Sequence, residues 1–250
     1  MSMELFPPPN HLIVQRISMR LCVAGVLAFL TCCLPASAGT IVGKVHAEGK
    51  AGADDHSGAS GGEYASRKYK FVPKMDYTDM HDFVVYIEGP VGTNRAPATN
   101  VIVTTKQIAQ HGAQFTPHIL PVMAGTTVEW PNNDDIYHNV FSMSDAKQFD
   151  LGLYKGDPPD KRVTFNKAGR VDVFCSIHQN MHCVVLVLEN PYFAVTDESG
   201  NYKIPDVPPG TYKLKAWQER LPADEQEIVV PTNGDVKADF TLTIKNLPQY

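Results

Sequence analysis

The sequence predicts an all-β protein in which short strands form sandwiches or barrels. Segments rich in β-branched and aromatic residues recur along the chain after residue 39, and such residues are typical of strands. Gly, Pro, Asn and Asp separate these segments and indicate turns. Windows of about 11 residues or more show no helical periodicity of apolar side chains, so we expect no helix.

The turn residues divide the chain into the following expected strands. The first two strands are 40–45 (TIVGKV) and 82–89 (DFVVYIEG). The middle of the chain supplies 100–106, 126–130, 138–142, 161–165, 170–175 and 183–189. After residue 190, a Ser-Gly turn and a Pro-Pro-Gly turn separate alternating strands, which continue at 227–230 and 238–244. We expect Met123 and Met143 to pack in the core.

The first 38 residues have the pattern of a targeting segment. Arg16 and Arg20 precede an apolar run from Leu21 to Leu34, and the small residues ASA follow at 36–38. This order is typical of a secretory signal peptide, and the run is too short to span a bilayer. No later stretch is apolar enough to cross a membrane. We therefore expect a periplasmic protein that has lost residues 1–38.

Residues 46–81 differ from the strand-forming segments. They are rich in Gly, Ala, Ser and Asp and can bury little apolar surface, so we expect a mobile loop. Copper capture by the His and Met residues of this loop is an alternative, although their spacing matches no metal template. The net charge of −5 and the absence of a basic cluster give no support to nucleic-acid binding.

The segment 173–183, VFCSIHQNMHC, contains the candidate metal ligands. Cys175, His178 and Met181 follow at intervals of three, and His138 stands 37 residues before the cysteine. One thiolate, two imidazoles and a thioether form a ligand set that selects copper. If His138 begins one strand and Cys175 ends another, the loop after Cys175 delivers the other two ligands to the same pocket.

Residues 99–189 resemble the cupredoxins in the stretches FTPHILPVMAGTTVEW and DDIYHNVFS and in the ligand loop Cys-x-x-His-x-x-Met, which has the amicyanin length. The resemblance implies a Greek-key sandwich with one type 1 (blue) copper centre. His138, Cys175 and His178 would be the strong ligands and Met181 the axial one. It also implies that the amide of Asn139 donates to the cysteine sulfur, and that the Asn139 side chain joins the two ligand loops.

Three alternatives to this centre remain open from the residues. Cys175 and Cys183 are the only cysteines after the signal segment, and an oxidising compartment favours a disulfide between them. His182 could replace Met181 as the axial ligand, as in a red-copper variant. Zinc could occupy the same ligands, although structural zinc sites favour more cysteines. We expect His118 to be a surface or internally satisfied histidine.

The C-terminal segment 190–246 resembles the transthyretin-like, carboxypeptidase-regulatory-like β-sandwich module through T-D-x-x-G-x-Y-x-I-x-x-V-P-x-G-x-Y-x-L. Such a module needs an earlier strand, and TIVGKV has the right form. We therefore expect a second, smaller sandwich in which 39–98 pairs with 190–246 and the segment 99–189 is inserted. Two domains in tandem are the simpler alternative.

The predicted function is one-electron transfer between redox partners, such as a c-type cytochrome or a dehydrogenase. Copper enzymes of the cupredoxin fold place a histidine beside the ligand cysteine, whereas Phe174 and Ser176 flank Cys175 here. We therefore expect no enzymatic activity. The alternatives are a copper chaperone or sensor, and a structural or adhesion module with a vestigial copper site.

Overall fold

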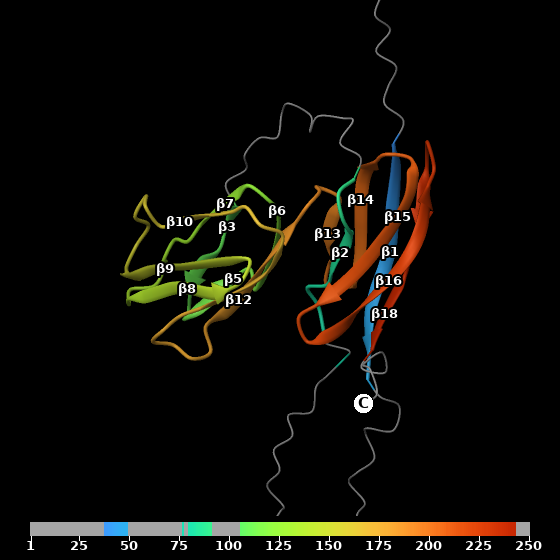
Figure 1. Ribbon diagram of the computed structural model, residues 1–250. Coiled ribbons are helices and arrows are strands. Elements are labelled where there is room, and N and C mark those ends of the chain that lie inside the picture. The colour runs from blue at the N-terminus through green and yellow to red at the C-terminus, as the bar shows by residue number, and fades with distance from the viewer. Residues whose placement is uncertain (1–37, 50–76, 78–79, 92–105, 244–250) are drawn as a thin grey trace, which may run out of the picture. The chain divides into compact units, whose positions relative to one another are not determined.

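The computed structural model describes residues 38–49, 77, 80–91 and 106–243. These residues form strands and no helix, which confirms the all-β prediction (Figure 1). Within the described ranges, no helix has the length and hydropathy needed to cross a lipid bilayer. Nearly all of the expected signal peptide, most of the expected loop and all but the last residue of the strand expected at 100–106 lie outside the described residues.

The middle of the chain forms one sandwich of β-sheets. Its larger sheet has the order β6-β12-β11-β8-β9, and a second sheet has the order β10-β7-β3, with β4 and β5 as a separate pair. The strands are β3 (Lys106–Gln107), β4 (Ala109–His111), β5 (Gln114–Thr116), β6 (Ile119–Met123), β7 (Thr126–Glu129), β8 (His138–Ser144), β9 (Lys147–Tyr154), β10 (Arg162–Phe165), β11 (Gly169–Phe174) and β12 (His182–Leu188).

Side-chain alternation along β11 positions the ligand loop. Val171 and Val173 are buried in the core of the sandwich while Phe174 is exposed, so the period-2 pattern turns Cys175 inward. In the antiparallel register with β12, Val173 pairs with Cys183. The loop 175–181 therefore connects two neighbouring strands of one sheet at a single end.

The remaining described strands form a second sandwich of two sheets. One sheet has the order β14-β1-β17 with β18 also paired to β1, and the other has the order β13-β2-β15-β16. The strands are β1 (Gly39–Glu48), β2 (Val84–Ile87), β13 (Phe193–Val195), β14 (Asn201–Val207), β15 (Gly210–Gln218), β16 (Leu221–Val230), β17 (Asp235–Lys237) and β18 (Phe240–Thr243).

Strands from both ends of the described chain share these two sheets. β1 pairs antiparallel with β14 and parallel with β17 and β18, and β2 lies between β13 and β15 (Figure 1). Ile41, Ile87, Ile204 and Leu214 from these strands are buried in one common core. The strands before residue 98 therefore complete the module whose other strands follow residue 190.

Two local expectations are wrong, and one strand was not predicted. β1 continues to Glu48, so His46 lies in a strand and not in a loop. β9 was not expected. Its side chains alternate between half-buried and exposed positions, and none is fully buried before Tyr154. The side chain of Met143 is 71% exposed on β8, because it points away from the core face that holds Val140 and Ser142.

Replacement of Trp130 by alanine is expected to lower the free energy of unfolding by about 3–5 kcal/mol. Trp130 is fully buried and packs against Phe115 with ring centroids 5.8 Å apart. Its indole nitrogen has no hydrogen-bond partner among the described residues, so the loss comes from packing alone. Calorimetric unfolding of the Trp130→Ala protein measures the loss. The matched control is Met143→Ala, for which we expect a change within about 0.5 kcal/mol.

Candidate metal centre

The structure brings His138, Cys175 and His178 together at one end of the first sandwich. His138 is the first residue of β8, and the other two lie in the loop between β11 and β12. Their ligand atoms all lie within 4.8 Å of one another. Nδ1 of His138 is 3.0 Å from Nδ1 of His178, and Sγ of Cys175 is 3.6 Å from the latter atom.

Asp134 determines which nitrogen of His138 is free to bind a metal. Nε2 of His138 lies 2.8 Å from Oδ2 of Asp134, and this carboxylate also accepts the backbone amides of Gly112 and Ala113. The amide of Ala113, aided by His138, lowers the pKa of Asp134 to about 2, so the carboxylate is ionised near neutral pH. It therefore accepts a hydrogen bond from the protonated Nε2, and Nδ1 of His138 presents a lone pair toward Cys175 and His178.

Cys175 and Met181 are held by backbone hydrogen bonds. The amide of Asn139 donates to Sγ of Cys175 at 3.5 Å, as the resemblance implied. The amide of Cys175 donates to the carbonyl of Met181, and the amide of Met181 donates to the carbonyl of His178, both at 3.1 Å. Met181 is buried in the same apolar cluster as Cys175. These two hydrogen bonds join the first and last residues of the loop and fix its shape.

The spacing of these donor atoms fits one metal ion. Metal–nitrogen bonds of about 2.0–2.1 Å and metal–sulfur bonds of about 2.3 Å place two ligands of one ion about 3–4 Å apart. The separations of 3.0 Å and 3.6 Å fall in this range. A buried thiol and two imidazoles, one with its tautomer fixed by a carboxylate, form a donor set suited to copper.

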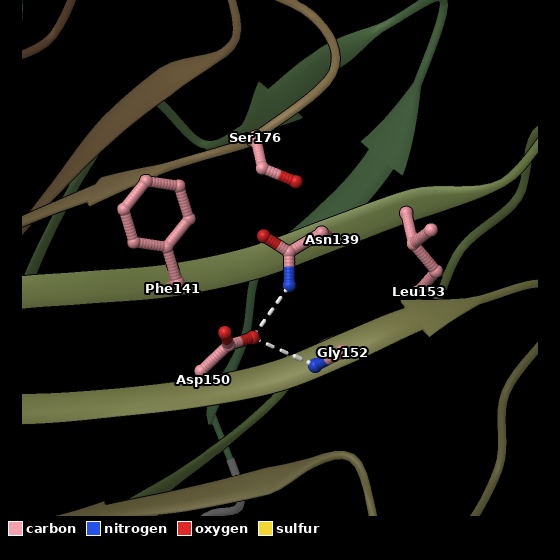
Figure 2. Close-up of a pocket in the computed structure, with 6 residues that line it drawn as sticks. All are labelled: Asn139, Phe141, Asp150, Gly152, Leu153 and Ser176. Atoms are coloured by element: carbon pink, nitrogen blue, oxygen red, sulfur yellow. Dashed lines mark hydrogen bonds between the residues drawn. The ribbon is translucent and has the colours of Figure 1, made fainter.

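The side chain of Asn139 does not join the two ligand loops as expected. Its Nδ2 donates to Oδ1 of Asp150 on β9 at 2.6 Å, and the amide of Gly152 donates to the same oxygen (Figure 2). These residues line a pocket of about 300 Å³ together with Phe141, Leu153 and Ser176. Asn139 therefore anchors the first ligand strand to its neighbour β9, because antiparallel pairing of β8 and β9 brings Asp150 within reach.

Two of the alternatives for this centre are wrong. Cys175 and Cys183, both described, are free thiols, so no disulfide joins them. Cys183 packs in the core, where burial raises the pKa of its thiol well above the usual range. The ring of His182 contacts Asp172 and Glu219 and is not one of the three residues grouped around Cys175. Strand alternation explains this, because the side chain of His182 points away from the core in which the side chains of Met181 and Cys183 are both buried.

Asp134 and Asp150, which position His138 and Asn139, were not predicted from the sequence. Asp134 belongs to the stretch PNNDDIYH, where two adjacent aspartates precede the histidine. The pattern does not show which of them turns toward the imidazole. The folded loop decides this, since Asp135 is fully exposed and pairs with Lys155.

Comparisons with known proteins agree with this geometry. Residues 102–188 match the family described as copper binding proteins, plastocyanin/azurin family, and residues 183–243 match the carboxypeptidase regulatory-like domain. The chain is 32% identical to amicyanin from Paracoccus versutus over 104 residues, which cover 40% of this chain and 74% of that protein.

Solved structures give weaker similarities. A copper-containing nitrite reductase from Thermus scotoductus is 26% identical with a TM-score of 0.32, covering 34% of this chain and 23% of that one. A reduced amicyanin variant is 24% identical with a TM-score of 0.30, covering 41% of this chain and 97% of that one. The identity with amicyanin and the family match over residues 102–188 give one assignment: the chain belongs to the plastocyanin/azurin family of copper-binding proteins.

Proposed function

We propose that the protein is a periplasmic one-electron carrier with a single type 1 copper centre formed by His138, Cys175, His178 and Met181. The observation that supports this most strongly is the convergence of one thiol and two imidazoles within a few ångströms in a largely buried site. Copper bound there would supply a one-electron couple. The pattern of residues 1–38 supports export to the periplasm.

The ligands are fixed by contacts outside the ligand set. Asp134 orients His138, the amide of Asn139 holds the sulfur of Cys175, and backbone bonds within the loop position His178 and Met181. Such contacts tune a metal site and hold its ligands in place. A site that cannot rearrange has little to reorganise when one electron arrives or leaves, which favours a carrier.

Three exposed apolar side chains adjoin residues of the metal centre, either in the sequence or in the β8–β9 register. Ile177 is 51% exposed beside His178, Tyr137 is 56% exposed beside His138, and Leu153 is 58% exposed opposite Asn139 in the β8–β9 register. Exposed apolar side chains gathered around a functional residue are typical of a protein–protein interaction site. We propose that a redox partner, such as a c-type cytochrome or a dehydrogenase, docks on this surface.

Electron exchange with a purified c-type cytochrome tests the function. We expect reversible voltammetry of the copper-loaded protein and a second-order exchange rate that falls at least about tenfold in Ile177→Asp, because a charge at the apolar surface disrupts docking. Val229→Asp, a change at an exposed position on β16 of the other module, is the control and should leave the rate unchanged.

The same experiment separates a carrier from a copper chaperone. A carrier keeps its copper through repeated oxidation and reduction. A chaperone would show irreversible voltammetry and would lose copper to a chelator on reduction. That result would contradict the proposed function.

A further inference from the structure

A second group of side chains that could hold a metal ion lies within the unit of residues 37–250. It consists of His118, His182 and Glu219, whose ligand atoms all lie within 4.8 Å of one another. His118 precedes β6 and His182 begins β12, and the parallel pairing of these strands places both imidazoles at the same end. Glu219 lies in the turn between β15 and β16.

Hydrogen bonding fixes the proton of His118 on Nδ1. This nitrogen lies 3.1 Å from the carbonyl oxygen of His182, which can only accept. In the neutral ring, Nε2 then has a lone pair, and it lies 2.9 Å from Oε1 of Glu219. A lone pair that faces a carboxylate is repelled unless a positive charge lies with them. The Arg220 guanidinium, whose Nε lies 3.4 Å from the same oxygen, partly balances the carboxylate but does not lie between it and the imidazole nitrogen. The charge between them is either a second proton on the ring or a metal ion.

His182 is oriented in the same way by a different acceptor. Its Nε2 lies 3.0 Å from Oδ1 of Asp172, a carboxylate that also accepts from Arg170. Nε2 therefore has the proton and Nδ1 has the lone pair. The ring stacks on Phe174 with centroids 4.7 Å apart, and its Nδ1 is 3.9 Å from Oε2 of Glu219, too far for a hydrogen bond.

A metal ion accounts for both contacts, whereas a proton accounts for one. An imidazolium at His118 would pair with Glu219 but would leave the lone pair of His182 facing the same carboxylate. Metal-ligating histidines characteristically donate their other ring nitrogen to a carboxylate or a backbone carbonyl, and both histidines do so here. We propose that His118, His182 and Glu219 bind a divalent transition metal ion, Cu(II) or Zn(II), separate from the type 1 centre.

The ligand types and their exposure define the kind of site. Two imidazoles and a carboxylate suit Zn(II) and Cu(II), and three protein ligands leave a coordination position open. The Glu219 side chain is 9% exposed and that of His118 is 37% exposed, so solvent reaches the cluster on the His118 side. A bound ion would join the β15–β16 turn to the adjacent ends of β6 and β12, and the Met181–His182 peptide would link the two metal sites.

Metal titration of the mature chain tests the proposal. The protein is first given one equivalent of copper, and the visible thiolate-to-copper absorption reports filling of the type 1 centre. Zn(II) is then added in a calorimeter, and in a parallel sample a second equivalent of Cu(II) is followed by EPR. We expect one further equivalent of at least one of these metals to bind, and the second copper to add no thiolate absorption.

Variants identify the ligands of this further equivalent. Glu219→Gln keeps the size of the side chain and His118→Ala alters a partly exposed residue, so both should fold and both should develop the thiolate absorption. We expect each to weaken binding of the further equivalent at least about tenfold. His46→Ala is the matched control. His46 is also an exposed histidine near a carboxylate, 3.4 Å from Oε1 of Glu48, but it lies outside the cluster.

The outcomes separate this proposal from the proposed function. A normal thiolate absorption without a further equivalent, or a further equivalent unchanged in Glu219→Gln and His118→Ala, overturns the second site alone. If the thiolate absorption never develops, the type 1 assignment fails. The second site is then tested by Zn(II) binding in the Cys175→Ala background, where loss of one equivalent in Glu219→Gln supports it and no loss overturns it.

Discussion

Replacement of Cys175 by alanine is expected to abolish the visible thiolate-to-copper absorption of the Cu(II)-loaded protein. Cys175 is the sulfur grouped with His138 and His178, and its Sγ accepts the amide of Asn139 at 3.5 Å. Without this sulfur no charge-transfer band can form, whatever the two imidazoles still bind. Absorption and EPR spectra of the loaded variant measure the loss, and we expect the band to disappear completely.

Cys183→Ala is the matched control for this experiment. Cys183 is fully buried in the core of the same sandwich, two positions after Met181, and its thiol is not grouped with the histidines. We expect the band to persist unchanged in this variant. Loss of the band in Cys183→Ala, or its survival in Cys175→Ala, would mean that the wrong cysteine has been assigned to copper.

Replacement of Asp134 by alanine is expected to weaken copper binding about 10–100-fold, the usual effect of removing the partner of a metal-bound histidine. The carboxylate lies 2.8 Å from Nε2 of His138 and keeps the Nδ1 lone pair directed into the site. Without it, the buried ring of His138 can adopt the wrong tautomer. Competition with a chelator of known copper affinity measures the change.

Asp135→Ala provides the control, because it removes a carboxylate at the neighbouring position. The Asp135 side chain is fully exposed and pairs with Lys155 at the surface, at 3.0 Å. Surface pairs of this kind contribute little, so we expect copper affinity to stay within about twofold. Equal losses in the two variants would show that net charge near the site matters and the orientation of His138 does not.

The grouping of His138, Cys175 and His178 could be predicted from the sequence because two of these candidate ligands lie in one short loop. Cys175, His178 and Met181 lie in one short loop, and strand alternation on either side of that loop determines which residues face the core. The same rule separates Met181 from His182, since neighbours on a strand point to opposite faces. The all-β class followed from composition and turns, whereas β9 was missed because its side chains show no buried alternation before Tyr154.

By itself the sequence determined that four candidate ligands stand in the order of a copper site and that strands at both ends have the pattern of a second module. Only the tertiary structure decided which residues support those candidates and which distant side chains meet elsewhere. Asp134 rather than Asp135 orients His138, and Glu219 meets His118 across 101 residues of chain. Contacts at such separation depend on how the sheets pack, and no local periodicity of residues records that packing.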